Sequence, residues 1–304
     1  MRRRTILAGV AALAAAGAAA LWFASAPDRL DPAVIAAAPA GDATRGEHVF
    51  WAAGCASCHA APGVTGEARL RLAGGVALDT PFGRFVAPNV SPHPGDGIGG
   101  WSFGDFANAL MRGVAPDGRH LYPAFPYTSY ARMTIADVAD LYAFMRTLPP
   151  VEGRAAGHEI GFPYNVRRGL GLWKWLYLTP APAVTLPEPS PEVARGQYLV
   201  EALGHCGECH TPRNFLGGPD RTRWLAGAPA AAGPGRVPGI TPGAAQVGGW
   251  SEDEIAEYLS SGFTPDFDSA GGAMAEVVLN TAELPDADRN AIAAYLKAVP
   301  PVAD

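Results

Sequence analysis

The sequence predicts an all-α, loop-rich chain in which an N-terminal apolar helix precedes two similar small domains. Three observations support this prediction: an uncharged apolar stretch near the N-terminus, an imperfect internal repeat, and one copy of the motif Cys-x-x-Cys-His in each half. Glycine (37 residues) and proline (29 residues) are abundant in the chain of 304 residues. This composition favours short helices and long loops over a large regular sheet.

The two motifs are Cys55-Ala56-Ser57-Cys58-His59 and Cys206-Gly207-Glu208-Cys209-His210, and together they use all four cysteines. Two thiols at this spacing can form thioether bonds with the vinyl groups of one haem, and the adjacent histidine can then bind the iron. A four-cysteine zinc site would need the two pairs close together, and a disulfide-exchange motif has no use for the histidine. The sequence therefore predicts two covalently bound haem c groups, with His59 and His210 as iron ligands.

The N-terminus combines three arginines at positions 2–4 with an uncharged stretch over residues 5–26. This is the layout of a secretory signal, but a helix of that length, at about 1.5 Å per residue, also crosses a bilayer. Trp22 lies where an aromatic interfacial anchor would lie, and Pro27 is unfavourable beside a cleavage site. We therefore expect residues 1–27 to be a membrane anchor, with a cleaved signal peptide as the alternative. The first places the rest of the chain on the periplasmic side of the inner membrane, the second in the soluble periplasm.

The internal repeat predicts the same order of helices in both halves. Matching segments are Arg45-Gly46 with Arg195-Gly196, residues 99–102 with 248–251, and residues 133–150 with 284–301. Ser102, Thr134 and Ser251 are each followed three residues later by a carboxylate, a pattern typical of a helix start. Apolar residues at helical spacing follow them.

Each half is thus predicted to have a helix leading to the haem motif, a short helix after a tryptophan, and a closing helix. This is the three-helix plan of a small class I cytochrome c. We expect one such domain over residues 41–151, an ordered linker over residues 152–190, and a second domain over residues 191–304. The prolines and aromatic residues of the linker are unlike a flexible tether.

The second axial ligand of each iron is expected to be a methionine thioether, which raises the reduction potential. Met274 is the only methionine of the second half, and it precedes the closing helix on a predicted loop. We therefore predict His210 and Met274 as the ligands of the second iron.

The first half offers no such clear candidate. The repeat places the ligand position near Phe125, and a phenylalanine cannot bind iron. Met111 and Met145 fall within predicted helices. Met133, at the start of the closing helix, is the favoured partner of His59, while His120 and a five-coordinate iron are the alternatives.

Charge argues against nucleic acid as a partner. The formal net charge is −6 at pH 7, and the haem propionates would add further negative charge. Such a surface repels a phosphate backbone.

Three segments, residues 89–101, 118–127 and 204–214, resemble the membrane-bound cytochrome c subunits of bacterial periplasmic dehydrogenases. These subunits serve quinoprotein alcohol, flavin-dependent gluconate, and molybdenum-type aldehyde or nicotinate dehydrogenases. The resemblance implies an electron-transfer subunit that accepts electrons from a dehydrogenase and passes them to quinone or a terminal oxidase. Two features depart from the family: its subunits commonly bind three haems, and many carry methionine at the position of Phe125.

Three functions therefore compete. The first is an electron carrier without substrate chemistry of its own, which we favour. The second is a dihaem peroxidase-like enzyme with one five-coordinate iron, which only Phe125 supports. The third is a haem-based sensor or assembly protein, which no motif specifically supports.

Overall fold

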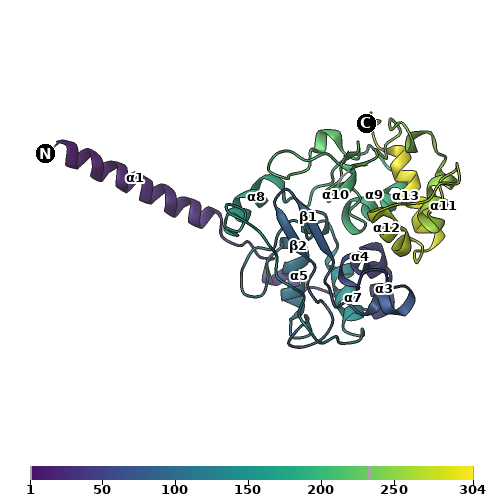
Figure 1. Ribbon diagram of the computed structural model, residues 1–304, viewed down its shortest axis with the longest axis horizontal. Coiled ribbons are helices and arrows are strands. Elements are labelled where there is room, and N and C mark those ends of the chain that lie inside the picture. The colour runs from purple at the N-terminus through teal and green to yellow at the C-terminus, as the bar shows by residue number, and fades with distance from the viewer. Residues whose placement is uncertain (1, 232–234, 304) are drawn as a thin grey trace.

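The fold is taken from a computed structural model that describes residues 2–231 and 235–303. Helix α1 (Arg2–Ala24) projects from one side of a body in which the two halves of the chain lie next to each other (Figure 1). A short helix, α2 (Pro32–Ala36), connects α1 to the first half. Helix α8 (Gly169–Tyr177) lies in the segment that connects the two halves, beside the end of α1 (Figure 1).

The elements follow the same order in both halves. The first half contains α3 (Ala43–Ala52), α4 (Cys55–His59), the 3-10 turn η1 (Gly66–Leu70), β1 (Ala77–Thr80), β2 (Gly83–Val86), α5 (Phe103–Arg112), α6 (Tyr127–Tyr130) and α7 (Ile135–Met145). The second half contains α9 (Pro191–Tyr198), the π-helical turn η2 (Leu199–Leu203), α10 (Gly207–His210), η3 (Arg221–Arg223), β3 (Ala228–Pro229), β4 (Arg236–Val237), η4 (Val247–Gly249), α11 (Glu252–Ser261), α12 (Ala273–Thr281) and α13 (Asp286–Ala298).

The strands correct the prediction of an all-α fold. β1 pairs antiparallel with β2, and β3 pairs antiparallel with β4, so each half carries a small ribbon in the loop after its haem motif. In the first ribbon, Gly83 has a φ of 127°, a conformation that a residue with a side chain rarely adopts. Ribbons this short lack the alternating apolar pattern by which a strand is recognised in a sequence.

The predicted helix starts are confirmed at all three positions. The hydroxyls of Ser102, Thr134 and Ser251 each accept a hydrogen bond from the backbone N–H three residues on, at the start of α5, α7 and α11. Ser102 and Ser251 also form complete capping boxes with Asp105 and Glu254. These caps satisfy backbone donors that would otherwise lack a partner at the helix start.

The repeated Arg-Gly pairs explain how the first and last helices of each half cross. A Cβ atom on Gly46 would lie 1.9 Å from the carbonyl oxygen of Asp140 on α7, and one on Gly196 would lie 1.8 Å from that of Ala291 on α13. Only glycine therefore allows either crossing. The preceding arginine, Arg45, forms a bidentate pair with the Asp140 carboxylate at 2.7 and 2.9 Å.

Candidate haem sites

Each haem motif begins directly after a residue with a positive φ. Gly54 has a φ of 64° before Cys55, and His205 has a φ of 43° before Cys206. These residues turn the chain sharply out of α3 and out of η2, so that the cysteines and the histidine lie on the short helices α4 and α10. A histidine in this conformation is uncommon, which indicates that its surroundings hold it there.

The two motif histidines are oriented in the same way. Nδ1 of His59 lies 2.8 Å from the carbonyl oxygen of Pro88, and Nδ1 of His210 lies 2.8 Å from that of Pro238. A carbonyl can only accept, so Nδ1 carries the proton and Nε2 is left free to bind a metal. Burial lowers the pKa of both histidines, which favours the neutral imidazole that binds iron.

None of the four motif cysteines forms a disulfide in the part of the chain that the structure describes. Before haem is attached, burial raises the pKa of the Cys55 and Cys206 thiols to about 12. In the second half, Trp224 is buried beside the motif. Trp224 packs against Gly207 of the motif. Paired cysteines outside any disulfide and an adjacent oriented histidine fit a covalently bound haem.

Main-chain hydrogen bonds show that Phe125 is the counterpart of Met274. The N–H of Leu121 donates to the Gly113 carbonyl at 2.7 Å, and that of Ala270 donates to the Gly262 carbonyl at the same distance. Phe125 and Met274 each lie four residues after these matching bonds. Met274 belongs to the first turn of α12 and not to the loop that the sequence predicted.

Met133, the favoured ligand of the first iron, lies in the hydrophobic core with 4% of its surface exposed. Its N–H donates to the Tyr130 carbonyl, and that of Leu284 donates to the Thr281 carbonyl, directly before α7 and α13. Leu284, equally buried at 4%, is therefore the counterpart of Met133 in the second half.

The alternative ligand, His120, uses both of its ring nitrogens elsewhere. Its Nε2 lies 2.9 Å from the Ser25 carbonyl oxygen, and its Nδ1 lies 3.1 Å from Nζ of Lys174. Iron could take His120 only after one of these bonds is broken. The other first-half methionines, Met111 and Met145, lie within α5 and α7, as predicted.

The two halves contact each other through a pseudo-twofold arrangement. His48 on α3 bonds to the Asp288 carboxylate on α13 at 2.7 Å, and Tyr198 on α9 donates to the Asp137 carboxylate of the first half. His48 and Tyr198 are counterparts in the repeat, as are Asp288 and Asp137. The same two positions therefore meet twice, once on each side of the axis.

The haem motifs themselves take part in this symmetry. Ser57, between the cysteines of the first motif, accepts a hydrogen bond from Asn280 on α12 at 2.6 Å. Its counterpart Glu208 accepts one from Ser129 on α6 at 3.1 Å, and a second from Thr128. The first motif is thus bonded to α12, which carries Met274. The second motif is bonded to α6, which begins two residues after Phe125. Near the axis, a Cβ on Gly54 would lie 3.7 Å from Nε2 of His205.

No sequence motif identified these interface residues. His48 and His205 have no spaced partner in the sequence, and Glu208 and Arg213, which form an ion pair, resemble ordinary surface residues. The one available signal was the repeat itself, which places polar residues at the matching positions 48 and 198.

Repeated helices, ribbons and oriented histidines define a protein of two tandem haem c domains, and the chain belongs to the cytochrome c family. The family model for cytochrome c matches residues 43–149 and 193–300. The chain carries two covalently bound haem c groups, one for each matched segment.

One relative matches nearly the whole chain, and others match most of it. A protein described as "Diheme cytochrome c-type" from Cereibacter sphaeroides is 56% identical over 99% of both chains. The fructose dehydrogenase cytochrome subunit of Gluconobacter japonicus is 40% identical over 86% of this chain and 53% of its own. A nicotinate dehydrogenase subunit of Pseudomonas putida is 41% identical over 84% of this chain and 21% of its own. The chain thus corresponds to only part of the length of these two dehydrogenase subunits.

Proposed function

We propose that this protein is a membrane-anchored electron carrier that accepts electrons from a periplasmic dehydrogenase and passes them to quinone or a terminal oxidase. The observation that carries the proposal is the meeting of the two haem motifs at one pseudo-twofold interface. Ser57 and Glu208, each within a motif, bond to the opposite half. Bound haem supplies one-electron exchange between ferric and ferrous iron. A rigid contact between the two motifs suits transfer from one haem to the other.

The residues around each haem would hold it with little rearrangement. Pro88 and Pro238 fix the motif histidines through their carbonyls. We propose that Met133 and Met274 supply the opposite ligands, although only Met274 is at the position that the repeat assigns to a ligand. Two axial ligands leave no coordination place for a substrate, which suits a carrier. The relatives are named as cytochromes or dehydrogenase subunits, so the peroxidase alternative gains no support from them.

The electron donor is inferred from the relatives. Proteins similar over 84–86% of this chain are named as subunits of nicotinate, fructose and alcohol dehydrogenases. We therefore propose a dehydrogenase subunit as the partner of this chain as well. Nothing comparable identifies the acceptor, and quinone and a terminal oxidase both remain in the proposal.

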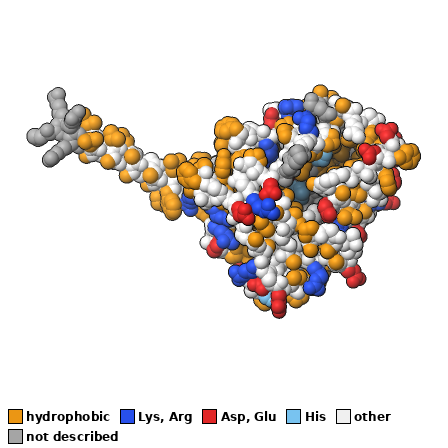
Figure 2. All heavy atoms as spheres, viewed as in Figure 1, with side chains coloured by type: hydrophobic (Ala, Val, Ile, Leu, Met, Phe, Trp, Pro, Cys, Tyr) orange, Lys and Arg blue, Asp and Glu red, His pale blue; other side chains and the backbone are white. Residues whose placement is uncertain are grey.

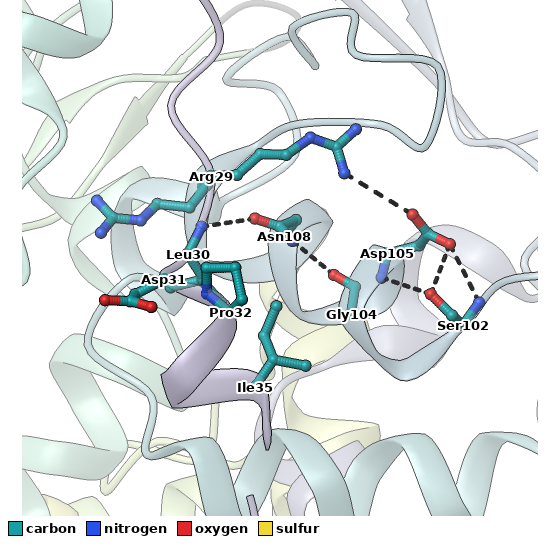
Figure 3. Close-up of a pocket in the computed structure, with 10 residues that line it drawn as sticks. Arg29, Leu30, Asp31, Pro32, Ile35, Ser102, Gly104, Asp105 and Asn108 are labelled. Carbon is teal, nitrogen blue, oxygen red and sulfur yellow. Dashed lines mark hydrogen bonds and ion pairs between the residues drawn. The ribbon is translucent and has the colours of Figure 1, made fainter. Parts of the chain in front are cut away.

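Membrane anchoring is supported by how the chain continues after α1. Residues 5–24 of α1 are mostly apolar, and none of them is buried. Their mean hydropathy is 2.1, and about 20 residues match a hydrocarbon layer of about 30 Å. Ser25 is buried, and its carbonyl accepts the hydrogen bond from His120. Next along the chain, the N–H of Leu30 donates to Asn108 on α5, and Arg29 pairs with Asp105 (Figure 3). Cleavage after Ala26 would remove Ser25 from this packed site, so we propose that α1 is retained.

The proposal is tested by purifying the protein from its native membranes in mild detergent and adding dehydrogenase substrates. We expect a substrate of the co-purified dehydrogenase to reduce both haems, as seen in the visible absorbance of ferrous haem c. Replacing Cys55 and Cys58 with serine should remove one covalent haem and lower the reducible haem by half. Haem that is extracted by acidic organic solvent, or haem that no co-purified dehydrogenase reduces, would contradict the proposal.

A further inference from the structure

Helix α8 is apolar apart from Lys174, and it buries this one charged side chain while large apolar side chains are exposed. Gly171 and Lys174 face inward and are buried, while Trp175 and Leu176 are 73% and 67% exposed. Half-buried Leu172 lies on the same outward face, at helical spacing from both exposed residues. Exposed large apolar side chains on one stripe require a partner other than water.

The apolar surface continues beyond α8 into the preceding loop and into the second half. Phe162 and Val166, in the loop before α8, are 83% and 52% exposed, and Phe215 of the second half is 86% exposed. The loops are joined to α8, since the indole N–H of Trp173 donates to the Leu216 carbonyl at 2.9 Å. We call these six residues the apolar belt: Phe162, Val166, Leu172, Trp175, Leu176 and Phe215.

The belt adjoins the point where α1 enters the body. A Cβ on Gly171 would lie 2.2 Å from the Ser25 carbonyl oxygen, so α8 packs directly on the end of α1. The guanidinium of Arg168 lies over the Trp22 ring at 4.2 Å and donates to the Ser25 hydroxyl. Figure 2 shows hydrophobic side chains gathered on the side of the body that α1 enters.

The belt residues on α8 lie close enough to the end of α1 to reach a bilayer interface. If the apolar part of α1 fills the hydrocarbon layer, Ser25 lies at its edge. Trp175 and Leu176 follow Gly171 by four and five residues, so they lie about 6–8 Å farther along α8. This is comparable to the headgroup region on one side of a bilayer. Tryptophan is enriched at that depth because its ring is apolar and its N–H is polar.

The charge around α8 fits anionic lipid. Residues 160–187 include the partly exposed Arg167 and Arg168 and contain no aspartate or glutamate, in a chain whose net charge is −6. Lys174 is buried and does not contribute to this surface. The local basic excess would attract an anionic headgroup layer and would hold an otherwise acidic protein at the membrane.

We propose that the apolar belt rests in the headgroup region of an anionic bilayer and fixes the orientation of the two haem domains relative to the membrane. The proposal rests on the retained anchor α1, and it adds a second membrane contact with a structural purpose. A single helix would leave the domains free to tilt, whereas two contacts define which face of each domain points away from the lipid.

The test uses the full-length protein in phosphatidylglycerol–phosphatidylethanolamine vesicles that contain a phospholipid with a photoactivatable carbene group. Labelled peptides are mapped by mass spectrometry. We expect label on α1 and on the peptides that carry residues 162–166 and 172–176. The double variant Trp175→Ser/Leu176→Ser should lose the label on α8 but keep the label on α1. Covalent haem content and visible absorbance of the variant must match those of the unmodified protein.

The matched control is Phe267→Ser. Phe267 is 90% exposed, more than any residue of the belt, but it lies between α11 and α12, away from α1. This variant should leave all labelling unchanged. Label confined to α1 would overturn the belt proposal and leave the anchor in place, whereas label on the belt without α1 would contradict the anchor instead. Crosslinks from the belt to a second copy of the chain, without lipid label, would assign the surface to self-association and also overturn the proposal.

Discussion

At the residue scale, the two halves differ at the position where the repeat predicts the iron ligand opposite the histidine. Met274 and Phe125 occupy matching positions, whereas Met133 matches the core residue Leu284. A thioether from Met133 would therefore come from a position that the second half uses for packing.

The match between Met133 and Leu284 allows a test of Met133 as the ligand of the first iron. Leucine fits the position of Met133, as Leu284 shows, so Met133→Leu should change the free energy of unfolding by less than about 1.5 kcal/mol. If Met133 binds iron, the variant should lose one of the two contributions to the near-infrared band of methionine-ligated ferric haem, and one reduction potential should fall. Redox titration and near-infrared absorbance measure both effects.

Met274→Leu should remove the other contribution, and Met145→Leu, within the core face of α7, should remove neither. An unchanged spectrum for Met133→Leu would show that Met133 is a core residue. In that case Phe125→Met, which places a thioether at the counterpart of Met274, should create a second near-infrared contribution and raise the potential of the first haem.

Some residue roles follow from sequence and others do not. The motif fixes Cys55, Cys58 and His59 because thioether chemistry demands that spacing. The Pro88 carbonyl that orients His59 comes from a loop nearly thirty residues away, and no local pattern marks a backbone acceptor. The pairing of His48 with Asp288 depends on how the two halves meet, which neither half encodes in a recognisable motif.

At the element scale, the crossing of the first and last helices depends on one glycine in each half. In Gly46→Ala, the new methyl group would overlap the Asp140 carbonyl, which is backbone of α7 and cannot rotate away. Alanine favours a helix by up to about 1 kcal/mol over glycine, but overpacking at a helix contact costs about 1–3 kcal/mol. We expect a net loss of stability, measured as a lower thermal midpoint by circular dichroism.

Gly157→Ala is the matched control, since a Cβ there meets no atom within 4 Å and its φ is not in the left-handed region. An equal thermal midpoint for both variants would mean that the helices separate at little cost.

The sequence predicted these helices well, because capping residues and apolar spacing are local signals. It missed the ribbons β1–β2 and β3–β4, whose pairing is set by loop packing.

At the scale of the whole molecule, a buried polar cluster joins the end of α1 to the first half and to α8. Lys174 on α8 donates to the Gly113 carbonyl at the end of α5 at 2.7 Å and to Nδ1 of His120. His120 in turn donates to Ser25 from Nε2. Three segments that are distant in sequence therefore meet in one chain of hydrogen bonds, which the repeat could not reveal because the second half has no equivalent of α1.

The cluster requires a neutral His120, because Nδ1 can accept from Lys174 only without a proton. Burial lowers the pKa of His120, and the nearby Lys174 and Arg168 charges lower it further, while the Ser25 carbonyl opposes them. Burial also lowers the pKa of Lys174 to about 7, which Asp28 opposes. Both groups therefore hold fewer protons in the folded protein than in the unfolded chain over defined ranges of pH.

Stability should rise with pH wherever the unfolded chain binds more protons. For His120 this range runs from its lowered folded pKa up to its ordinary value of about 6.5, so acidification through this range should destabilise the protein. For Lys174 the range runs from about 7 up to its ordinary value, so stability should rise further on going alkaline. The slope within either range is about 1.4 kcal/mol per pH unit for one proton.

The measurement is the free energy of unfolding of the full-length protein in detergent from pH 5 to 10, compared with that of His120→Gln. Glutamine keeps an N–H donor for the Ser25 carbonyl but does not titrate, so the variant should lose the acidic slope and retain the alkaline one. Other histidines titrate equally in both proteins and cancel in the difference. If the free energies of unfolding of the two proteins fall equally at acidic pH, His120 accepts a proton without disturbing the cluster. The segment that follows α1 is then held by its other contacts, those of Ser25 with Arg168 and of Leu30 with Asn108.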